Sequence, residues 1–409
     1  MKFLLLTQYY SPEVGAPQTR LAAVVRELRA FGDDVEVVTA MPNYPTGKIQ
    51  PGFERRIIAT AVEDGVRIHR VWMLAALGTG TRRLVSYLSF TTMCLLALLR
   101  TARPDVIVIE SPPLFVALPG ILYGKLRRIP IVLNVADLWP DAAAAVGAVS
   151  PGRLLNAMLA LERWAYRHAD VVSTVTDGVR ARLLEKGVPE GKVALLVNGV
   201  DVSMFNPEAS DPAILDDLDL PVKPFLVYAG TMGLAHDLDP LLTAMAALKD
   251  DSDMPYLLMI GGGSERERLE SRVRNEALSN VVFRQAIPPE QLARLLPCAE
   301  VGVVTLADIP LNKDTRPAKL LPLMASGIPC LFAGTGEGAS VLTDPCAGLA
   351  VGNVADEITQ ALRNLIGDAA MRQRMGQAGR ASAVSSWSWQ AHVRPWRTAI
   401  QNVVERRHR

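Results

Sequence analysis

The chain has 409 residues, of which 49% are hydrophobic and 21% are charged, and its formal net charge is +1. This balance is typical of a folded globular protein and implies no strongly charged partner such as a nucleic acid. A single hydrophobic core rarely extends beyond about 250–300 residues, so we expect two domains.

The start of the chain and its cysteines bear on localisation. The first apolar run covers only 3–6, and no small-residue cleavage site follows, so no secretory signal is predicted. The four cysteines, at 94, 298, 330 and 346, lack the spacing of a metal site or a disulfide scaffold. We therefore expect a cytoplasmic protein.

Charge is unevenly distributed along the chain. Residues 1–130 contain 16 Lys and Arg against 10 Asp and Glu, whereas the remainder contains 27 against 32. Two interpretations stay open: the basic first third faces an anionic surface such as lipid headgroups or a lipid diphosphate, or it simply exposes solvated arginines.

Strand-like and helix-like segments alternate through the first half. Short runs rich in Val, Ile and Leu predict buried strands at 2–7, 34–39, 105–110, 130–135, 170–175 and 193–197. Apolar residues on both faces are typical of parallel strands covered by helices. Since helix-length segments such as 17–31 lie between them, a doubly wound α/β sheet is expected.

The segment 84–99 is uncharged, with arginines at 82, 83, 100 and 103 around it. It is shorter than the roughly 20 apolar residues that a membrane-spanning helix needs. Two interpretations remain: a buried core helix, or a half-exposed helix lying on a bilayer surface with arginines at its ends.

The strand pattern restarts in the second half. Strands are predicted at 224–230, 255–263, 281–286, 301–306 and 329–334, after a polar, proline-containing linker at 205–223. We therefore expect Rossmann-like domains at 1–204 and 205–385, with a final tryptophan-containing helix at 386–409 packing back on the first. Because open α/β sheets bind ligands at the carboxyl ends of their strands, the two sheets should face a central cleft.

Glycine-containing loops follow several predicted strands. In the first domain Gly15 precedes a helix with Pro17 in its first turn. In the second domain such loops lie at 230–233, 261–263 and 334–339. Helix N-termini beside glycine loops expose N–H groups to anions, so together the three second-domain loops favour a diphosphate site, although each alone is typical of an ordinary turn.

A basic pair follows the strand at 301–306. Arg316 and Lys319 are three residues apart, and Pro317 predicts a helix that starts there and runs to about residue 326. Cations at a helix N-terminus oppose its dipole unless an anion lies between them, so the pair indicates a phosphate site, with two solvated bases as the alternative.

At this point the sequence resembles the retaining glycosyltransferases of family four, which have the GT-B fold, over nearly its whole length. The segments that carry the resemblance are 11–17 (SPEVGAP), 111–115 (SPPLF), 137–140 (DLWP), 198–201 (NGVD), 228–234 (YAGTMGL), 317–320 (PAKL), 324–327 (MASG) and 374–376 (RMG). The branch it most resembles adds deoxy-aminosugars such as N-acetylfucosamine during bacterial surface-polysaccharide assembly.

The resemblance implies a GT-B fold, a UDP-sugar donor held mainly by the second domain, an acceptor held by the first, retention of anomeric configuration, and no cofactor or essential metal. Lys319 matches the family's phosphate-binding lysine. The other donor contacts that it implies or leaves as candidates are Gly15, Gly230, Thr231, Met232, Gly233, His236, Gly261, Gly262, Gly263, Ile287, Gly336, Glu337, Gly338 and Ala339. Glu13 and Trp139 are the candidate acceptor contacts.

The chain departs from the family pattern at two places. Many members carry two Glu with seven residues between them; here Asp314 takes the first position, whereas Pro322 takes the second and cannot accept a ribose hydroxyl. Glu337 is the candidate replacement. Ala136 stands where many members have His, which leaves Asp137 as the catalytic candidate beside Lys319, Arg316 and Asp314, although Asp137 could equally cap a helix.

Several functions remain in competition. The expected one is transfer of a sugar, with a deoxy or N-acetylamino sugar as the candidate, to a lipid-linked saccharide or another hydroxyl acceptor, by a protein peripheral to the inner face of the cytoplasmic membrane. The alternatives are a natural-product glycosyltransferase, a GT-B epimerase, for which the chain has few histidines, and a non-catalytic binding subunit, which Pro322 and Ala136 would suit.

Overall fold

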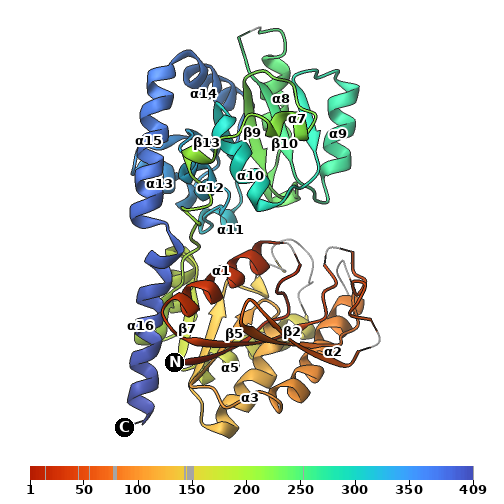
Figure 1. The fold of residues 1–409 in the computed structure, drawn as a ribbon, viewed down its shortest axis with the longest axis vertical. Helices are drawn as coiled ribbons and strands as arrows, with labels where there is room; N and C mark the ends of the chain where they lie inside the picture. The colour runs from red at the N-terminus through yellow and green to blue at the C-terminus, as the bar shows by residue number, and fades with distance from the viewer. Residues whose placement is uncertain are drawn as a thin grey trace. The chain divides into compact units, whose positions relative to one another are not determined.

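The computed structural model describes residues 1–13, 15–44, 46–54, 56–76, 81–141, 144, 152–251 and 253–408. Val14 of the first family-like segment therefore lies outside the described residues. The chain divides into two compact units: unit 1 comprises Met1–Asn198 with His392–Arg409, and unit 2 comprises Gly199–Ala391 (Figure 1). The division falls a few residues before the predicted boundary at 204/205.

Unit 1 is built on an eight-stranded sheet in the order β3-β4-β2-β1-β5-β6-β7-β8. Its strands are β1 (Lys2–Leu6), β2 (Asp34–Ala40), β3 (Ile58–Glu63), β4 (Val66–Val71), β5 (Val106–Ser111), β6 (Ile131–Val135), β7 (Val171–Thr174) and β8 (Val193–Leu195). All neighbouring strands pair in parallel except β3, which is antiparallel to β4. The residues that the strands contribute to the hydrophobic core are Val, Ile and Leu with one Ala, as the sequence predicted.

Unit 1 also contains helices, of which all but the last connect successive strands. They are α1 (Ala16–Ala30), α2 (Thr81–Leu98), α3 (Ala117–Arg127), α5 (Arg153–His168), α6 (Asp177–Glu185) and most of α16 (Trp389–His408). Trp396 of α16 stacks on Phe3 with ring centroids 6.4 Å apart, and Arg397 Nη2 donates to Asp33 Oδ1 at 2.7 Å. The end of the chain is thereby anchored to the start of the first strand.

Unit 2 contains a six-stranded parallel sheet in the order β11-β10-β9-β12-β13-β14. Its strands are β9 (Phe225–Ala229), β10 (Tyr256–Ile260), β11 (Val281–Arg284), β12 (Val301–Thr305), β13 (Cys330–Ala333) and β14 (Gly348–Val351). Its helices are α7 (Ile214–Asp217), α8 (Asp239–Ala247), α9 (Arg266–Asn275), α10 (Pro289–Leu295), α11 (Pro310–Lys313), α12 (Leu320–Ala325), α13 (Glu337–Thr343), α14 (Ala355–Gly367) and α15 (Ala369–Ser386).

The α/β class with two parallel sheets is therefore confirmed, and so are the eleven predicted strands. The helix predicted from Pro317 begins three residues later, at Leu320, so Arg316 and Lys319 precede it rather than lie in its first turn. The predicted final helix at 386–409 corresponds to α16, which begins at Trp389 and is separated from α15 by a break at 387–388. No helix within the described ranges is both long and apolar enough to cross a bilayer.

Candidate functional site

The side chain of Lys319 lies at the centre of the site in unit 2. Its Nζ is 2.9 Å from Nε2 of His236 and 5.2 Å from the centre of the Tyr228 ring. These residues come from the carboxyl end of β9, the short helix that follows it (Leu234–His236), and the turn before α12. They meet because β9 and β12 are neighbours in the sheet, which brings the loops after both strands to one edge.

Burial governs the charges of this pair. Desolvation lowers the pKa of Lys319 to about 7. Desolvation and the nearby Lys319 cation lower the pKa of His236 to about 4. At neutral pH the imidazole of His236 is therefore neutral and the amine of Lys319 is only partly protonated. The imidazole can accept a hydrogen bond from this amine. A bound anion would therefore strongly stabilise the protonated form of this lysine.

Two glycine loops pack directly against each other beside Lys319. Gly230, with φ of +146°, leaves room for the Lys319 stem, because a Cβ there would lie 2.2 Å from Cε. A Cβ on Gly261 would lie 2.0 Å from the carbonyl oxygen of Gly230, and Met232 N donates to Gly262 O at 2.7 Å. Glycine is thus required for the close approach of the two loops.

The third glycine loop borders the other end of the basic segment. Arg316 Nε lies 2.7 Å from Glu337 Oε2, and the Arg316 guanidinium is 5.8 Å from the centre of the Trp387 ring. A Cβ on Gly336 would lie 2.2 Å from the carbonyl oxygen of Lys313. Glu337, the candidate for a ribose contact, therefore has an arginine partner.

The predicted donor residues of unit 2 thus form two neighbouring groups joined by the segment 312–319. The first group contains Gly230, Thr231, Met232, Gly233, His236, Gly261, Gly262, Gly263 and Lys319. The second contains Asp314, Arg316, Gly336, Glu337, Gly338 and Ala339, the last three being in the first turn of α13 rather than in a loop. Ile287 lies after β11 and packs on the core. Among the described residues, no group of three or more His, Cys, Asp or Glu is arranged to hold a metal ion.

In unit 1 the predicted residues also lie after strands of the sheet. Gly15 precedes α1, and Pro17 lies in the first turn of that helix, as predicted. Glu13 is buried, and its Oε1 accepts from the backbone N–H groups of Asn43 at 2.6 Å and Tyr44 at 2.8 Å. The Glu13 carboxylate therefore joins the loops after β1 and β2, and its contact with an acceptor stays a prediction.

Trp139 belongs to an aromatic cluster that sequence reasoning missed. Its ring centre lies 5.9 Å from that of Phe115 and 6.5 Å from that of Tyr87, both edge-on. Arg83 lies 4.8 Å from the centre of the Tyr87 ring and donates to the Tyr9 hydroxyl. Half-buried aromatic rings beside an arginine can bind the apolar faces and hydroxyls of a sugar.

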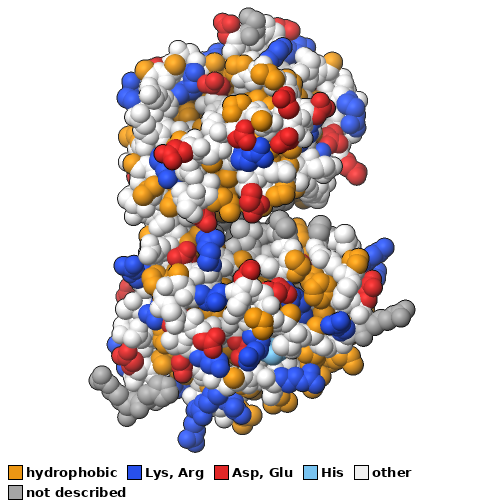
Figure 2. Space-filling model, in the orientation of Figure 1, with side chains coloured by type: hydrophobic (Ala, Val, Ile, Leu, Met, Phe, Trp, Pro, Cys, Tyr) orange, Lys and Arg blue, Asp and Glu red, His pale blue; other side chains and the backbone are white. Residues whose placement is uncertain are grey.

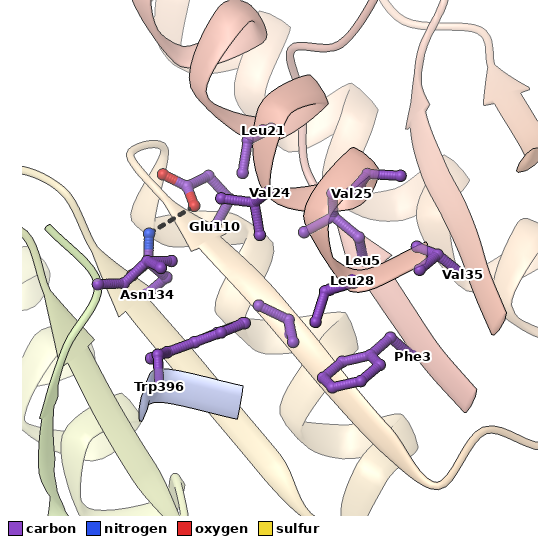
Figure 3. A pocket seen from close by; sticks show the side chains of 12 residues that line it. Phe3, Leu5, Leu21, Val24, Val25, Leu28, Val35, Glu110, Asn134 and Trp396 are labelled. Atoms are coloured by element: carbon purple, nitrogen blue, oxygen red, sulfur yellow. Dashed lines mark hydrogen bonds between the residues drawn. The ribbon is translucent and has the colours of Figure 1, made fainter. Parts of the chain in front are cut away.

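A buried polar network lies near Asp137, which is itself exposed. Arg20 of α1 pairs with Glu110 of β5, and Glu110 Oε2 accepts from Asn134 Nδ2 of β6 at 2.8 Å (Figure 3). Ser173 of β7 donates to Asn134 Oδ1 at 2.9 Å. Although the Asp137 side chain reaches solvent, desolvation by the residues around its carboxyl group raises its pKa, and the charge of Arg20 offsets this only in part. The network also borders a small, otherwise apolar cavity in the core.

No single sequence signal pointed to this network. Arg20 occupies the stripe of α1 that otherwise holds buried Leu21, Val24 and Leu28, and Glu110 lies in a strand of aliphatic residues. A charge within each apolar pattern was the only available indication that the two side chains pair.

Comparisons with known proteins cover both units. Residues 15–199 match the family model described as "Glycosyl transferase 4-like domain", and residues 216–382 match "Glycosyl transferases group 1". Together the two matches leave out only the ends of the chain and a short segment between the units.

Individual proteins agree with these matches. The chain is 28% identical to the putative colanic acid biosynthesis glycosyl transferase WcaI of Escherichia coli over 80% of this chain and 82% of that protein. It is 25% identical to a GDP-mannose-dependent alpha-(1-6)-phosphatidylinositol monomannoside mannosyltransferase of Mycolicibacterium smegmatis, over 71% and 82%. The structure of a sucrose-phosphate synthase from Thermosynechococcus elongatus superimposes with a TM-score of 0.76 at 19% identity, covering 99% of each chain.

Proposed function

Since this chain is a family-four glycosyltransferase of the GT-B architecture, we propose that it transfers a sugar from a nucleoside diphosphate sugar to a hydroxyl of a lipid-linked saccharide during assembly of a surface polysaccharide or glycoconjugate. The observation that carries the proposal is the Lys319 cation, held beside two closely packed glycine loops. Following the family resemblance, the expected donor is a UDP-sugar, the anomeric configuration is retained, and no metal is required.

The donor diphosphate is assigned to unit 2. Lys319 supplies the first positive charge and Arg316 the second, while the glycine loops expose backbone N–H groups without side chains in the way. A diphosphate leaving group gains negative charge as the glycosidic bond breaks, so these fixed charges stabilise the transition state more than the ground state. Glu337 would then exchange its arginine partner for a hydroxyl of the nucleoside.

The acceptor is assigned to unit 1. Trp139 and its aromatic neighbours offer a surface on which a sugar ring can stack, and Asp137 offers a carboxylate to orient a hydroxyl. The two relatives described above are named for colanic acid biosynthesis and for mannosylation of a phosphatidylinositol mannoside, and a lipid-linked or polymeric acceptor fits both. A deoxy or N-acetylamino sugar remains the proposed type of transferred group.

The test of this proposal is a thermal-shift screen of the whole chain against UDP, GDP, dTDP and UDP-N-acetyl sugars without added metal. A ligand that binds only the folded state raises the melting temperature, by an amount equivalent to about 2.7 kcal/mol at a hundredfold excess over Kd. We expect a shift with UDP and its sugars. A shift with GDP alone, the nucleotide named for the mycobacterial relative, would replace UDP as the donor base.

The same screen discriminates between function classes. A folded chain that no nucleotide stabilises would contradict the proposal and favour a non-catalytic binding subunit, in which Pro322 would account for the lost nucleoside contact. Transfer of the sugar to a small aglycone but to no lipid-linked saccharide would instead identify a natural-product glycosyltransferase.

At pH 8, the chain should take up a proton when it binds a nucleoside diphosphate. The free chain has Lys319 with a pKa of about 7, so most of the side chain is neutral at that pH. A bound diphosphate favours the ammonium and raises its pKa, so affinity should fall by up to about tenfold for each pH unit above 7. His236, with a pKa of about 4, stays neutral and does not contribute.

Calorimetric titration in two buffers of different ionisation enthalpy measures this uptake. The matched variant is Lys319→Arg, whose guanidinium stays charged, and it should bind without net proton uptake. Equal apparent heats in both buffers for the unmodified chain would contradict the assignment of Lys319 to the diphosphate.

A further inference from the structure

Helix α2 has one buried and one exposed apolar face. Phe90, Cys94 and Ala97 are fully buried in the core of unit 1, so the helix packs on the sheet. The opposite face is nevertheless mostly apolar, with Thr92 among its polar members. Its exposed apolar side chains are Val85, Leu88, Leu95 and Leu96 of the helix and Leu99 directly after it, which is 76% exposed. The interpretation as a core helix therefore holds for one face of α2. The other face has the exposed apolar side chains that the interpretation as a surface-binding helix requires.

Helix α3, which packs beside α2, repeats this arrangement. Ile121 and Tyr123 are buried, whereas Leu122 and Leu126 are exposed, Leu126 by 81%. Leucines four residues apart lie on one face of a helix. We use the name leucine surface for Val85, Leu88, Leu95, Leu96, Leu99, Leu122 and Leu126. Exposed apolar residues at helical spacing on two adjacent helices are more than the scattered leucines of an ordinary protein surface.

The charged residues of the two segments that carry the leucine surface are all of one sign. The segments 82–103 and 117–128 contain Arg82, Arg83, Arg100, Arg103, Lys125, Arg127 and Arg128, and no Asp or Glu. The last three of these form the exposed end of α3. Figure 2 shows hydrophobic side chains beside Lys and Arg along the lower border of the unit that contains the N-terminus.

We propose that the leucine surface of α2 and α3 binds the surface of an anionic lipid bilayer, with its leucines in the acyl region and the flanking arginines and lysine at the headgroups. A leucine gains free energy only where water is removed, and each Lys or Arg near an anionic leaflet adds attraction, so the pattern fits an anionic lipid surface better than another polar protein. Binding at this surface would bring unit 1 to the membrane that holds the proposed lipid-linked acceptor.

The test is flotation of the whole chain with vesicles of phosphatidylcholine alone and of phosphatidylcholine mixed with phosphatidylglycerol. We expect flotation with the mixed vesicles, weakened by added salt because the headgroup attraction is screened. The triple variant Leu88→Gln, Leu95→Gln and Leu99→Gln should lower the partition coefficient by about tenfold or more. Leu98 is unsuitable for such a variant because it is buried.

Two further variants make the test specific. Arg100→Gln with Lys125→Gln and Arg127→Gln should weaken binding to the mixed vesicles by about tenfold or more and leave the little binding to neutral vesicles unchanged. The matched control, Val222→Gln with Val354→Gln and Val384→Gln, removes three exposed apolar side chains of unit 2 and should float like the unmodified chain.

Three results would overturn the proposal. They are no flotation of the unmodified chain, equal flotation of the leucine variant, and a dimer that the leucine variant converts to a monomer while no lipid is bound. The melting temperature of each variant establishes that it is folded. Because flotation needs neither donor nor acceptor, its failure would leave the proposed transfer reaction standing, and failure of the nucleotide screen would leave the lipid-binding surface standing.

Discussion

The variant Lys319→Met should lose about 10²–10³-fold or more in turnover, the size of effect seen when one charge-stabilising group is removed from a transition state. Methionine keeps an apolar stem of similar length over Gly230 and removes only the cation. The loss should appear in kcat as well as in kcat/KM, since the positive charge matters most once the diphosphate begins to leave. Steady-state kinetics with the donor identified by the nucleotide screen measures both constants.

Stability separates this catalytic loss from unfolding. The pKa of Lys319 is lowered in the folded chain, so between about pH 7 and the ordinary lysine pKa of about 10.4 the unfolded state binds more protons. Folding therefore opposes protonation, and removing the amine should leave the free energy of unfolding unchanged or raise it. Lys249→Met, at an exposed position of unit 2, is the control and should keep full turnover. A Lys319→Met chain with unchanged turnover would remove this residue from the mechanism.

The sheets could be predicted from the sequence because their strands are short aliphatic runs flanked by loops. The hairpin of β3 and β4 was not predicted, because its strands do not have this pattern. β3 is largely exposed, and β4 contains the buried polar side chains of His69 and Arg70. Their partners lie on the two neighbouring strands, with His69 Nε2 2.6 Å from Glu36 Oε1 of β2 and Arg70 Nη1 2.6 Å from Glu63 Oε1 of β3. A hydrophobic pattern along one strand does not reveal the pairing of polar side chains between strands.

The site was predictable where it follows strand ends and glycines, and less so where it depends on side-chain contacts. The glycine loops were recognised because each directly follows an aliphatic strand. The contact between Lys319 and His236 spans 83 residues and depends on β9 and β12 being neighbours. From the sequence alone, Arg316 was expected at a helix N-terminus with no negatively charged partner, whereas the structure pairs it with Glu337. The carboxylate of Glu337 thus offsets the positive charge of Arg316.

Truncation of the buried pair in unit 1 should have the largest effect on stability. Glu110→Ala leaves the Arg20 guanidinium buried without its carboxylate, and the loss of one partner of a buried ion pair costs about 3–5 kcal/mol. The Asn134 amide, which donates to Glu110, would lose its acceptor as well. Urea unfolding followed by circular dichroism should show this as a lower midpoint for one of two transitions, because the two units have separate cores.

The double variant Arg20→Leu with Glu110→Leu tests the cause of this cost. If the cost arises from an unpaired buried charge, replacing both partners by apolar side chains should restore most of the lost free energy. Glu190→Ala is the matched control, since it breaks the exposed pair with Arg180 and should cost no more than about 1 kcal/mol. A double variant less stable than Glu110→Ala would show that the polar network across β5, β6 and β7 stabilises unit 1 through its hydrogen bonds, beyond compensating two charges.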